Sequence, residues 1–361
     1  MRRVLGAGAA LAMMLGGLLA IGAGTAAAAN SIVVGPNDSI QAAINAVPPG
    51  GTVIVQGGVH AEHLVITKTV NLVGSGNPTL VSPQGEAPPS PCSGPDPNED
   101  GVCVAGNFTF DNQGNITIYS SVQGVRISGF TIRGFDGTGI EQFAGSGSTF
   151  TSNRLLGNGE YGIAAFFSTG TTEVSNFATG SGEAGFYIGD SHPANATLTG
   201  NTSTDNLFGF FIRDAEYGRL ASNDSHGNCI GILFVADAPG PDGAFNVQGN
   251  SVNQNNKACP ADPDEQTPPL SGLGLVLFGA HDVNATGNII KGNVASGDSL
   301  ASAGVALLPG DLGTPPTNNT VRGNVIQQNS LDILWFDQIG TGNVLQPNVC
   351  QTSDPSGLCS S

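Results

Sequence analysis

The sequence predicts an all-β solenoid, in which short strands stack in successive coils. Three observations predict it: a repeat of Asn residues through most of the chain, a composition rich in turn residues and poor in charge, and β-like runs too short to fold alone. Of the 361 residues, 54 are Gly and 22 are Pro, while only 11% are charged. This composition excludes coiled coils and helical bundles, because folded proteins average about a quarter charged residues and those classes need more.

The first 29 residues are typical of a secretory signal peptide. Arg2 and Arg3 precede an apolar run from Val4 to Ile21, and four Ala residues lie before Asn30. The sequence therefore predicts a signal peptide over 1–29, one domain over 30–361, and secretion to an extracellular location. No second apolar run is long enough to span a bilayer, so we expect no membrane span in the mature chain.

The charge of the chain limits its partners. The formal net charge is −17, and removal of Arg2 and Arg3 makes it −19. Such a surface repels nucleic acid and anionic membranes. If the partner is an acidic polymer, a bound cation or a local basic patch is needed to hold it.

The repeat is marked by Asn residues that are 22 to 38 positions apart. A second Asn follows five positions later in six of the repeats, Ser181 takes that place in another, and Phe130 and Phe135 take both places one repeat earlier. Asn tolerates left-handed backbone and can hydrogen-bond to the next coil, so we expect a ladder of Asn side chains at each turn. The first set is Asn153, Asn176, Asn201, Asn223, Asn250, Asn288, Asn324 and Asn348; the second is Asn158, Asn206, Asn228, Asn255, Asn293 and Asn329.

The period and the residue types of the repeat distinguish a β-helix from other solenoid proteins. Leucine-rich repeats have a similar period, but they need Leu at spacings that are absent here. Hexapeptide and calcium-binding nonapeptide repeats have much shorter periods. The sequence therefore predicts a single-domain right-handed parallel β-helix of eleven or twelve coils.

The N-terminal region predicts a cap on this solenoid. Residues 38–47 carry a helix N-cap signal followed by apolar residues at helical spacing, and this helix would cover the strand edges at the open end. The first strands are expected at 53–55, 64–66 and 70–73. The stretch SIQAAINAVPPGGTVIVQGGVHAEHLVITKTVNLVGSG, residues 39–76, with the coils that follow it, resembles the secreted pectate-lyase-like β-helix superfamily.

This resemblance implies the fold but not one activity. The superfamily contains lyases, hydrolases, esterases, epimerases, periplasmic accessory proteins and inactive adhesins. The chain lacks the Asp-Pro-His-Glu/Asp motif of mannuronan epimerases, and also the motifs of pectin esterases, polygalacturonases and pectate lyases.

Six Cys residues remain after the signal peptide, which suggests disulfides. The simplest of the 15 pairings joins neighbours along the chain. The repeat places Cys229 and Cys259 near the same corner of adjacent coils, which supports the middle pair. The expected pairs are Cys92 with Cys103, Cys229 with Cys259, and Cys350 with Cys359, the first two holding insertions at 83–102 and 258–271.

An Asp closes the strand after the second turn in consecutive coils. Asp190, Asp214 and Asp237 are therefore expected within roughly one or two strand spacings of each other, about 4.8 Å each. Stacked carboxylates persist when they are protonated, solvated or bridged by a hard cation such as Ca²⁺. The resemblance implies two roles, cation ligands as in the lyases or acid/base groups as in the hydrolases, with Arg213 as the base or as the partner of a substrate carboxylate. The alternative is that Asp merely ends strands in Asx turns.

Alternation along these strands predicts an apolar ridge on the outside. Tyr187 and Phe211 would point outward and could stack on sugar rings, with Tyr217 and Arg219 in the turn that follows. The ridge is either a polysaccharide-binding groove or a surface that an insertion or the C-terminal tail covers.

Together these features predict a secreted protein that binds or processes an extracellular polysaccharide, as a lyase or a hydrolase if it is an enzyme. The alternatives are a non-catalytic structural or surface-adhesion solenoid and, third, a periplasmic accessory-type protein. The sequence does not indicate an oligomeric state.

Overall fold

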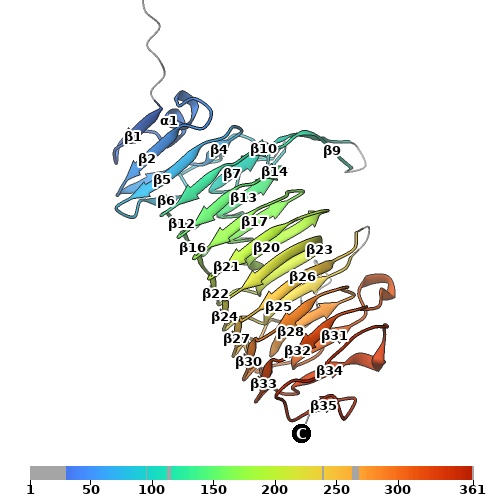
Figure 1. The fold of residues 1–361 in the computed structure, drawn as a ribbon. Helices are drawn as coiled ribbons and strands as arrows, with labels where there is room; N and C mark the ends of the chain where they lie inside the picture. Colours follow the sequence, from blue (N-terminus) through green and yellow to red (C-terminus); the bar gives the residue numbers. More distant parts are fainter. Residues whose placement is uncertain (1–29, 95, 112–114, 238–239, 262–267, 360–361) are drawn as a thin grey trace, which may run out of the picture.

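A computed structural model describes residues 30–94, 96–111, 115–237, 240–261 and 268–359. The predicted signal peptide lies outside these residues. The described chain winds into coils stacked along one axis, from the N-terminal end in blue to the C-terminal end in red (Figure 1). Each regular coil passes through a first, a second and a third sheet, all with parallel pairing. The predicted parallel β-helix is confirmed.

The strands of the three sheets are short because each spans only one side of a coil. The first sheet contains β1 (Ser31–Val34), β2 (Thr52–Gln56), β5 (Asn71–Ser75), β11 (Arg126–Ser128), β15 (Thr149–Thr151), β18 (Thr172–Val174), β21 (Ala196–Thr199), the end of β23 (Phe208–Ala221), β26 (Gly243–Gln248), β29 (Asn284–Thr286) and β32 (Thr320–Arg322). The second contains β3 (Val59–Ala61), β6 (Thr79–Val81), β12 (Thr131–Arg133), β16 (Arg154–Leu156), β19 (Phe177–Thr179), β22 (Thr202–Thr204), β24 (Asp224–His226), β27 (Ser251–Asn253), β30 (Ile289–Lys291) and β33 (Val325–Gln327). The third contains β4 (Leu64–Ile66), β7 (Val102–Ala105), β13 (Ile140–Phe143), β17 (Ile163–Phe166), β20 (Ala184–Ser191), the start of β23, β25 (Ile230–Val235), β28 (Leu273–Phe278), β31 (Ala303–Leu308), β34 (Ile333–Trp335) and β35 (Ser353–Asp354).

The remaining elements lie outside this frame. An antiparallel hairpin of β8 (Asn107–Phe110) and β9 (Ile116–Ser120) extends away from the stack (Figure 1). A short parallel pair joins β10 (Val122–Gln123) and β14 (Gly145–Ser146), and single 3₁₀ turns η1 and η2 occupy Asp311–Gly313 and Phe336–Gln338. No helix among the described residues is long and apolar enough to cross a membrane.

Both Asn ladders form. In the first, between the first and second sheets, the side-chain oxygen of Asn201 accepts the backbone N–H and the side-chain N–H of Asn176, at 2.9 and 3.0 Å. In the second, between the second and third sheets, Asn228 accepts the N–H of Asn206 at 2.9 Å. The N–H of Phe130 likewise donates to Asn153, as the repeat predicts.

One detail of the ladder prediction was wrong. The left-handed residue is the one before most of the ladder Asn residues, such as Ser175 (φ 55°), Gly200 (φ 65°) and Ser222 (φ 54°). The ladder Asn itself supplies the side-chain bonds between coils. Gly and Ser dominate the position before it because they adopt positive φ at low cost or fit the tight turn.

Both ends of the solenoid are closed. At the N-terminal end, α1 (Ile40–Ala46) begins after Ser39, whose hydroxyl accepts the N–H of Ala42. Ile40 and Ile44 bury their side chains in the core, so the predicted cap is confirmed.

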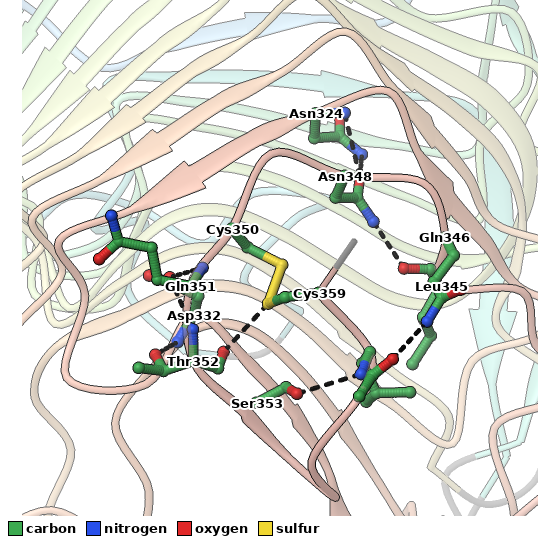
Figure 2. Close-up of a disulfide and its surroundings, with 12 residues drawn as sticks. Asn324, Asp332, Leu345, Gln346, Asn348, Cys350, Gln351, Thr352, Ser353 and Cys359 are labelled. Carbon is green, nitrogen blue, oxygen red and sulfur yellow. Dashed lines mark hydrogen bonds between the residues drawn. A yellow bond between two sulfur atoms is a disulfide. The ribbon is translucent and has the colours of Figure 1, made fainter. Parts of the chain in front are cut away.

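At the C-terminal end, the Cys350–Cys359 disulfide ties the tail back under the last coil (Figure 2). The carboxylate of Asp332 accepts the N–H groups of Gln351 and Thr352 from that tail. The other two disulfides are Cys92–Cys103 and Cys229–Cys259, so the structure has the neighbour pairing predicted from the sequence.

Candidate functional site

The Asp residues singled out from the sequence lie at the third corner of the coils, where the third sheet turns into the first. β20 and β23 pair so that Gly189 lies opposite Arg213 and Ser191 opposite Ala215, which places Asp190 beside Asp214. Both Asp residues have left-handed backbone, with φ of 49° and 46°. Asp tolerates this geometry better than most residues because its short polar side chain can bond locally.

Asp237 joins this pair from the next coil but is displaced by one position. β25 places Val235 opposite Arg213, so Ala236 occupies the register of Asp214. The backbone N–H of Asp237 donates to Asp214 Oδ1 at 2.8 Å, and Arg213 Nη2 contacts Asp237 Oδ2 at 2.5 Å. The structure thus brings together all four residues predicted as catalytic.

A fourth carboxyl group completes the cluster. Asp311, in η1, makes a side-chain hydrogen bond with Asp237, and this bond together with burial raises the pKa of Asp311. Two carboxyl groups can share a hydrogen bond only if one of them carries a proton. The guanidinium of Arg213 favours the ionised form of Asp237, and the contact with Asp237 favours the protonated form of Asp311.

Burial also shifts the other carboxyl groups of the corner. It raises the pKa of Asp214 to about 6, with the backbone N–H of Asp237 opposing the rise and the charge of Asp190 adding to it. Burial likewise raises the pKa of Asp190, while Arg213 opposes the rise. Burial alone would lower the pKa of Arg213, but the surrounding acidic groups raise it above its usual range, so this side chain is held as a cation.

The predicted Ca²⁺ site at Asp190, Asp214 and Asp237 does not fit this arrangement. Asp214 accepts a backbone N–H, and Asp237 faces both Arg213 and Asp311, so the oxygens do not converge on one point. Among the described residues, the only three potential ligands whose atoms all lie within 4.8 Å of one another are those of Cys92, Asp100 and Glu141.

That second group is an acidic cluster which the sequence reasoning missed. Cys92 is disulfide-bonded and offers no thiolate. Burial raises the pKa of Asp100 to about 6, with the N–H of Thr138 opposing the rise and the charges of Glu160 and Glu99 adding to it. The insertion at 83–102 brings these acids together, and no repeat spacing could have shown it.

The apolar ridge is mostly covered, which corrects one predicted role. Tyr187 is 1% exposed, with the rings of Tyr161 and Phe166 each 4.8 Å from its own, so it cannot stack on a sugar ring. These aromatic side chains come from the preceding coil, and strand alternation within one coil could not reveal that they would fold over Tyr187. Phe211 is 6% exposed and contacts both Tyr187 and Phe208.

Beside the covered ridge, the outside of the third sheet is hollowed into a cleft of ≈ 950 Å³, here named the third-sheet cleft. Its floor is apolar and its rim is charged. The insertion at 258–271 forms one wall through Cys259, Pro260, Ala261 and Pro268. The floor and rim residues are Leu207, Phe208, Phe211, Leu233, Val235 and Phe278, with Glu160, Glu183, Asp205, Arg213, Asp237, Lys257 and Asp311.

Tyr217 and Arg219 do not belong to this cleft, which corrects their predicted role. β23 is continuous around the third corner, so Arg219 pairs with Thr197 and Asn246 of the first sheet. Both side chains are exposed there, on a different side of the coil.

Next to them lies a cluster that spacing did not predict. Glu216 contacts His192 at 3.3 Å and His281 at 3.2 Å, and His281 contacts Asp282 at 2.8 Å. A Cβ atom at Gly240 would lie 2.6 Å from His192 Nε2 and 3.2 Å from Asp214 Cβ, so this glycine separates the histidine cluster from the Asp residues.

Comparison with known proteins supports the fold. The family model "Right handed beta helix region" matches residues 165–330. No curated protein sequence matches the chain. Among solved structures, the A-module of the mannuronan C-5 epimerase AlgE4 from Azotobacter vinelandii is 17% identical, covers 86% of this chain and 92% of its own, and has a TM-score of 0.56. The Dettilon tailspike protein gp208 is 15% identical, covers 87% of this chain and 67% of its own, and has a TM-score of 0.51.

These identities are low, so the likeness speaks for the fold and not for the activity. The disulfides are typical of an oxidising compartment, outside the cell or in a periplasm. The stacked coils, the Asn ladders and the family model that matches residues 165–330 lead to one conclusion: the described chain has the fold of a right-handed parallel β-helix.

Proposed function

We propose that this secreted protein binds an extracellular polysaccharide in the third-sheet cleft. The observation that carries the proposal is a cleft of ≈ 950 Å³ whose apolar floor is bordered by charged groups, including the Arg213–Asp237–Asp311 cluster. Sugar rings present apolar C–H faces and a rim of hydroxyl groups, and a floor of this kind beside polar groups matches both. The epimerase module with the same fold acts on mannuronan, which makes a polysaccharide a reasonable ligand for the fold.

If the protein is an enzyme, the cluster favours hydrolysis over a Ca²⁺-dependent elimination. Asp311 would give its proton to the glycosidic oxygen as the bond to the anomeric carbon breaks, and a water would add to that carbon. A second, ionised carboxylate of the cleft lining would take the proton of the water. Arg213 keeps Asp237 ionised and thereby holds the proton on Asp311, so its role is positioning rather than that of a base.

The test uses purified residues 30–361 with a panel of neutral, amino and acidic polysaccharides, with Ca²⁺ or with chelator. Binding, reducing ends and the ultraviolet absorbance of unsaturated products are followed together. We expect binding that Val235→Trp abolishes by filling the cleft and that Val344→Trp, on an exposed site elsewhere, leaves unchanged. Reducing ends that Asp311→Asn removes without loss of binding support the hydrolase, whereas absorbance that requires Ca²⁺ contradicts it.

The covered ridge favours a second candidate, a non-catalytic structural or adhesion solenoid. Tyr187 is packed beneath neighbouring aromatic rings, and Arg213 is already paired with Asp237, as that alternative requires. Absence of binding across a broad panel would shift the conclusion to this candidate.

A further inference from the structure

We propose that the third-sheet cleft selects polysaccharides that carry free amino groups and rejects polyuronates. This inference rests on the proposed function and names the substrate class of the same site. Five carboxyl groups line the cleft, against two cationic side chains. The observation behind the proposal is that both cationic side chains of the described lining, Arg213 and Lys257, are already paired with carboxylates and are not available to an anionic ligand.

Both cations already face carboxylates. Arg213 contacts Asp237 at 2.5 Å, and Lys257 contacts Asp205 at 3.2 Å. A sugar carboxylate that approached either cation would have to displace an internal carboxylate, which would then lose its partner. The cleft therefore provides no basic patch, which a chain with a formal net charge of −17 needs in order to hold an acidic polymer.

The remaining acids give the cleft a negative rim. Even with one proton shared between Asp237 and Asp311, the carboxylates outnumber the cations, and Glu160 and Asp205 are exposed to solvent. A cleft lined by charge of one sign concentrates ligands of the opposite sign and repels those of the same sign. Ammonium groups on the ligand would face this rim while the sugar rings lie on Leu207, Val235 and Phe278, the half-buried apolar side chains of the floor.

The experiment compares three oligosaccharides of equal length: β-1,4-linked glucosamine, its fully N-acetylated form, and mannuronate. Binding to residues 30–361 is measured by calorimetry at a pH where the amino groups are protonated, at about 0.02 M and about 0.5 M salt. We expect the glucosamine oligomer to bind about tenfold or more tightly than the acetylated one at low salt, and mannuronate to bind most weakly. The advantage of the glucosamine oligomer should shrink at high salt.

Variants of the cleft show whether its acidic rim causes the preference for the glucosamine oligomer. The double change Glu160→Gln and Asp205→Asn removes two exposed carboxylates of the cleft and releases Lys257, so the preference for glucosamine should fall several-fold and mannuronate binding should rise. Asp298→Asn removes an exposed carboxylate that does not line the cleft and serves as the control.

The outcomes separate the two proposals. Mannuronate binding as tight as that of glucosamine, or a glucosamine preference that neither salt nor the double change alters, overturns the inference and leaves polysaccharide binding standing. If only the acetylated oligomer binds, the charge argument is equally wrong. If none of the three binds and no member of the wider panel does, the proposed function itself fails.

Discussion

Each coil of this solenoid turns at three corners: two that carry the Asn ladders, here called the Asn corners, and the third corner, which carries Asp190 and Asp214. All three corners turn the chain from one sheet to the next, but they use different side chains to do so. At the Asn corners, one amide side chain recurs in coil after coil and bonds to the coils on both sides. At the third corner, carboxyl groups, histidines and insertions replace it, and Asp190 and Asp214 both take left-handed backbone. An amide is neutral and both donates and accepts, so it can stack indefinitely, whereas carboxylates can stack only with added protons or cations. The fold can be built with amide side chains at its corners, so the carboxyl groups of the third corner are not needed for folding and mark this corner as the candidate functional region.

The largest expected effect is the loss of one ladder amide. Asn201→Ala leaves the N–H of Asn176 and the carbonyl of Glu173 buried without their partner, so the free energy of unfolding should fall by about 3 kcal/mol or more. Urea unfolding of both proteins measures this change in the free energy of unfolding. The control is Asn246→Ala, which removes an exposed amide and should change stability by less than about 0.5 kcal/mol. Equal losses in both variants would mean that the ladder is not a stabilising device.

A similar but more local effect is expected from the disulfide beside the cleft. Cys229→Ser with Cys259→Ser opens a loop of 30 residues, which should cost about 3 kcal/mol. Because the bond holds the wall that Cys259, Pro260, Ala261 and Pro268 contribute to the cleft, limited proteolysis should first cut within the insertion at 258–271. The matched pair is Cys350→Ser with Cys359→Ser, which should expose the C-terminal tail instead. Cleavage at the same place in both pairs would contradict this assignment.

A smaller effect, which grows as the pH rises above 4.5, is expected from Glu173, a carboxyl group inside the apolar core. Glu173 is fully buried at a position that Phe150 and Leu198 occupy in the adjacent coils. Neither of its carboxyl oxygens has a hydrogen-bond partner among the described residues. Burial raises the pKa of Glu173 well above 4.5. The folded state then binds a proton that the unfolded state releases above pH 4.5, so stability should fall as pH rises. Glu173→Gln should match the native protein at pH 4 and exceed it by up to about 3 kcal/mol at pH 7.

The measurement is the free energy of unfolding of both proteins across that pH range. Curves that stay parallel would mean that Glu173 finds a compensating partner when it ionises.

The smallest expected effect comes from the third corner itself. The folded-state pKa of Asp214 is raised from 3.8 to about 6, so its contribution to stability is present below pH 3.8 and lost as pH rises through 6. Asp214→Asn keeps an acceptor for the N–H of Asp237 and should gain about 1 kcal/mol near pH 7, with solvent and Arg213 limiting the gain. Thermal unfolding between pH 4 and pH 8 checks the sign, and Asp298→Asn, at an exposed site, provides the control.

The repeat in the sequence predicted the fold well, but it predicted the candidate site only in part. The period, the two Asn sets and the cap helix all express local turn chemistry that recurs, so Asn201 and Asn228 could be assigned before any contact was known. The approach of Asp190 to Asp214 followed from the same register. Asp311 also follows a strand of the third sheet, β31, but at a looser offset, so the register could not show that it would contact Asp237.

The corrected residues show where such reasoning fails. Strand alternation pointed Tyr187 outward, and it does leave the core, but side chains from another coil cover it. Tyr217 and Arg219 follow Asp214 closely in sequence, yet the chain turns the corner between them and they face another side. Closeness along a β-helix is a property of the coil register, not of sequence distance.

The sequence by itself determined the solenoid and the column of acids, because both depend on local turn preferences repeated at a fixed spacing, and it determined the cap through a helix N-cap signal and apolar spacing. Only the tertiary structure decided that Arg213 pairs with Asp237, that the contact with Asp237 raises the pKa of Asp311, and that residues 259–261 and 268 border an acid-rimmed cleft beside the apolar ridge. These features depend on side chains from loops and coils that no period relates, and their energies arise from burial and charge, which exist only once the coils are stacked.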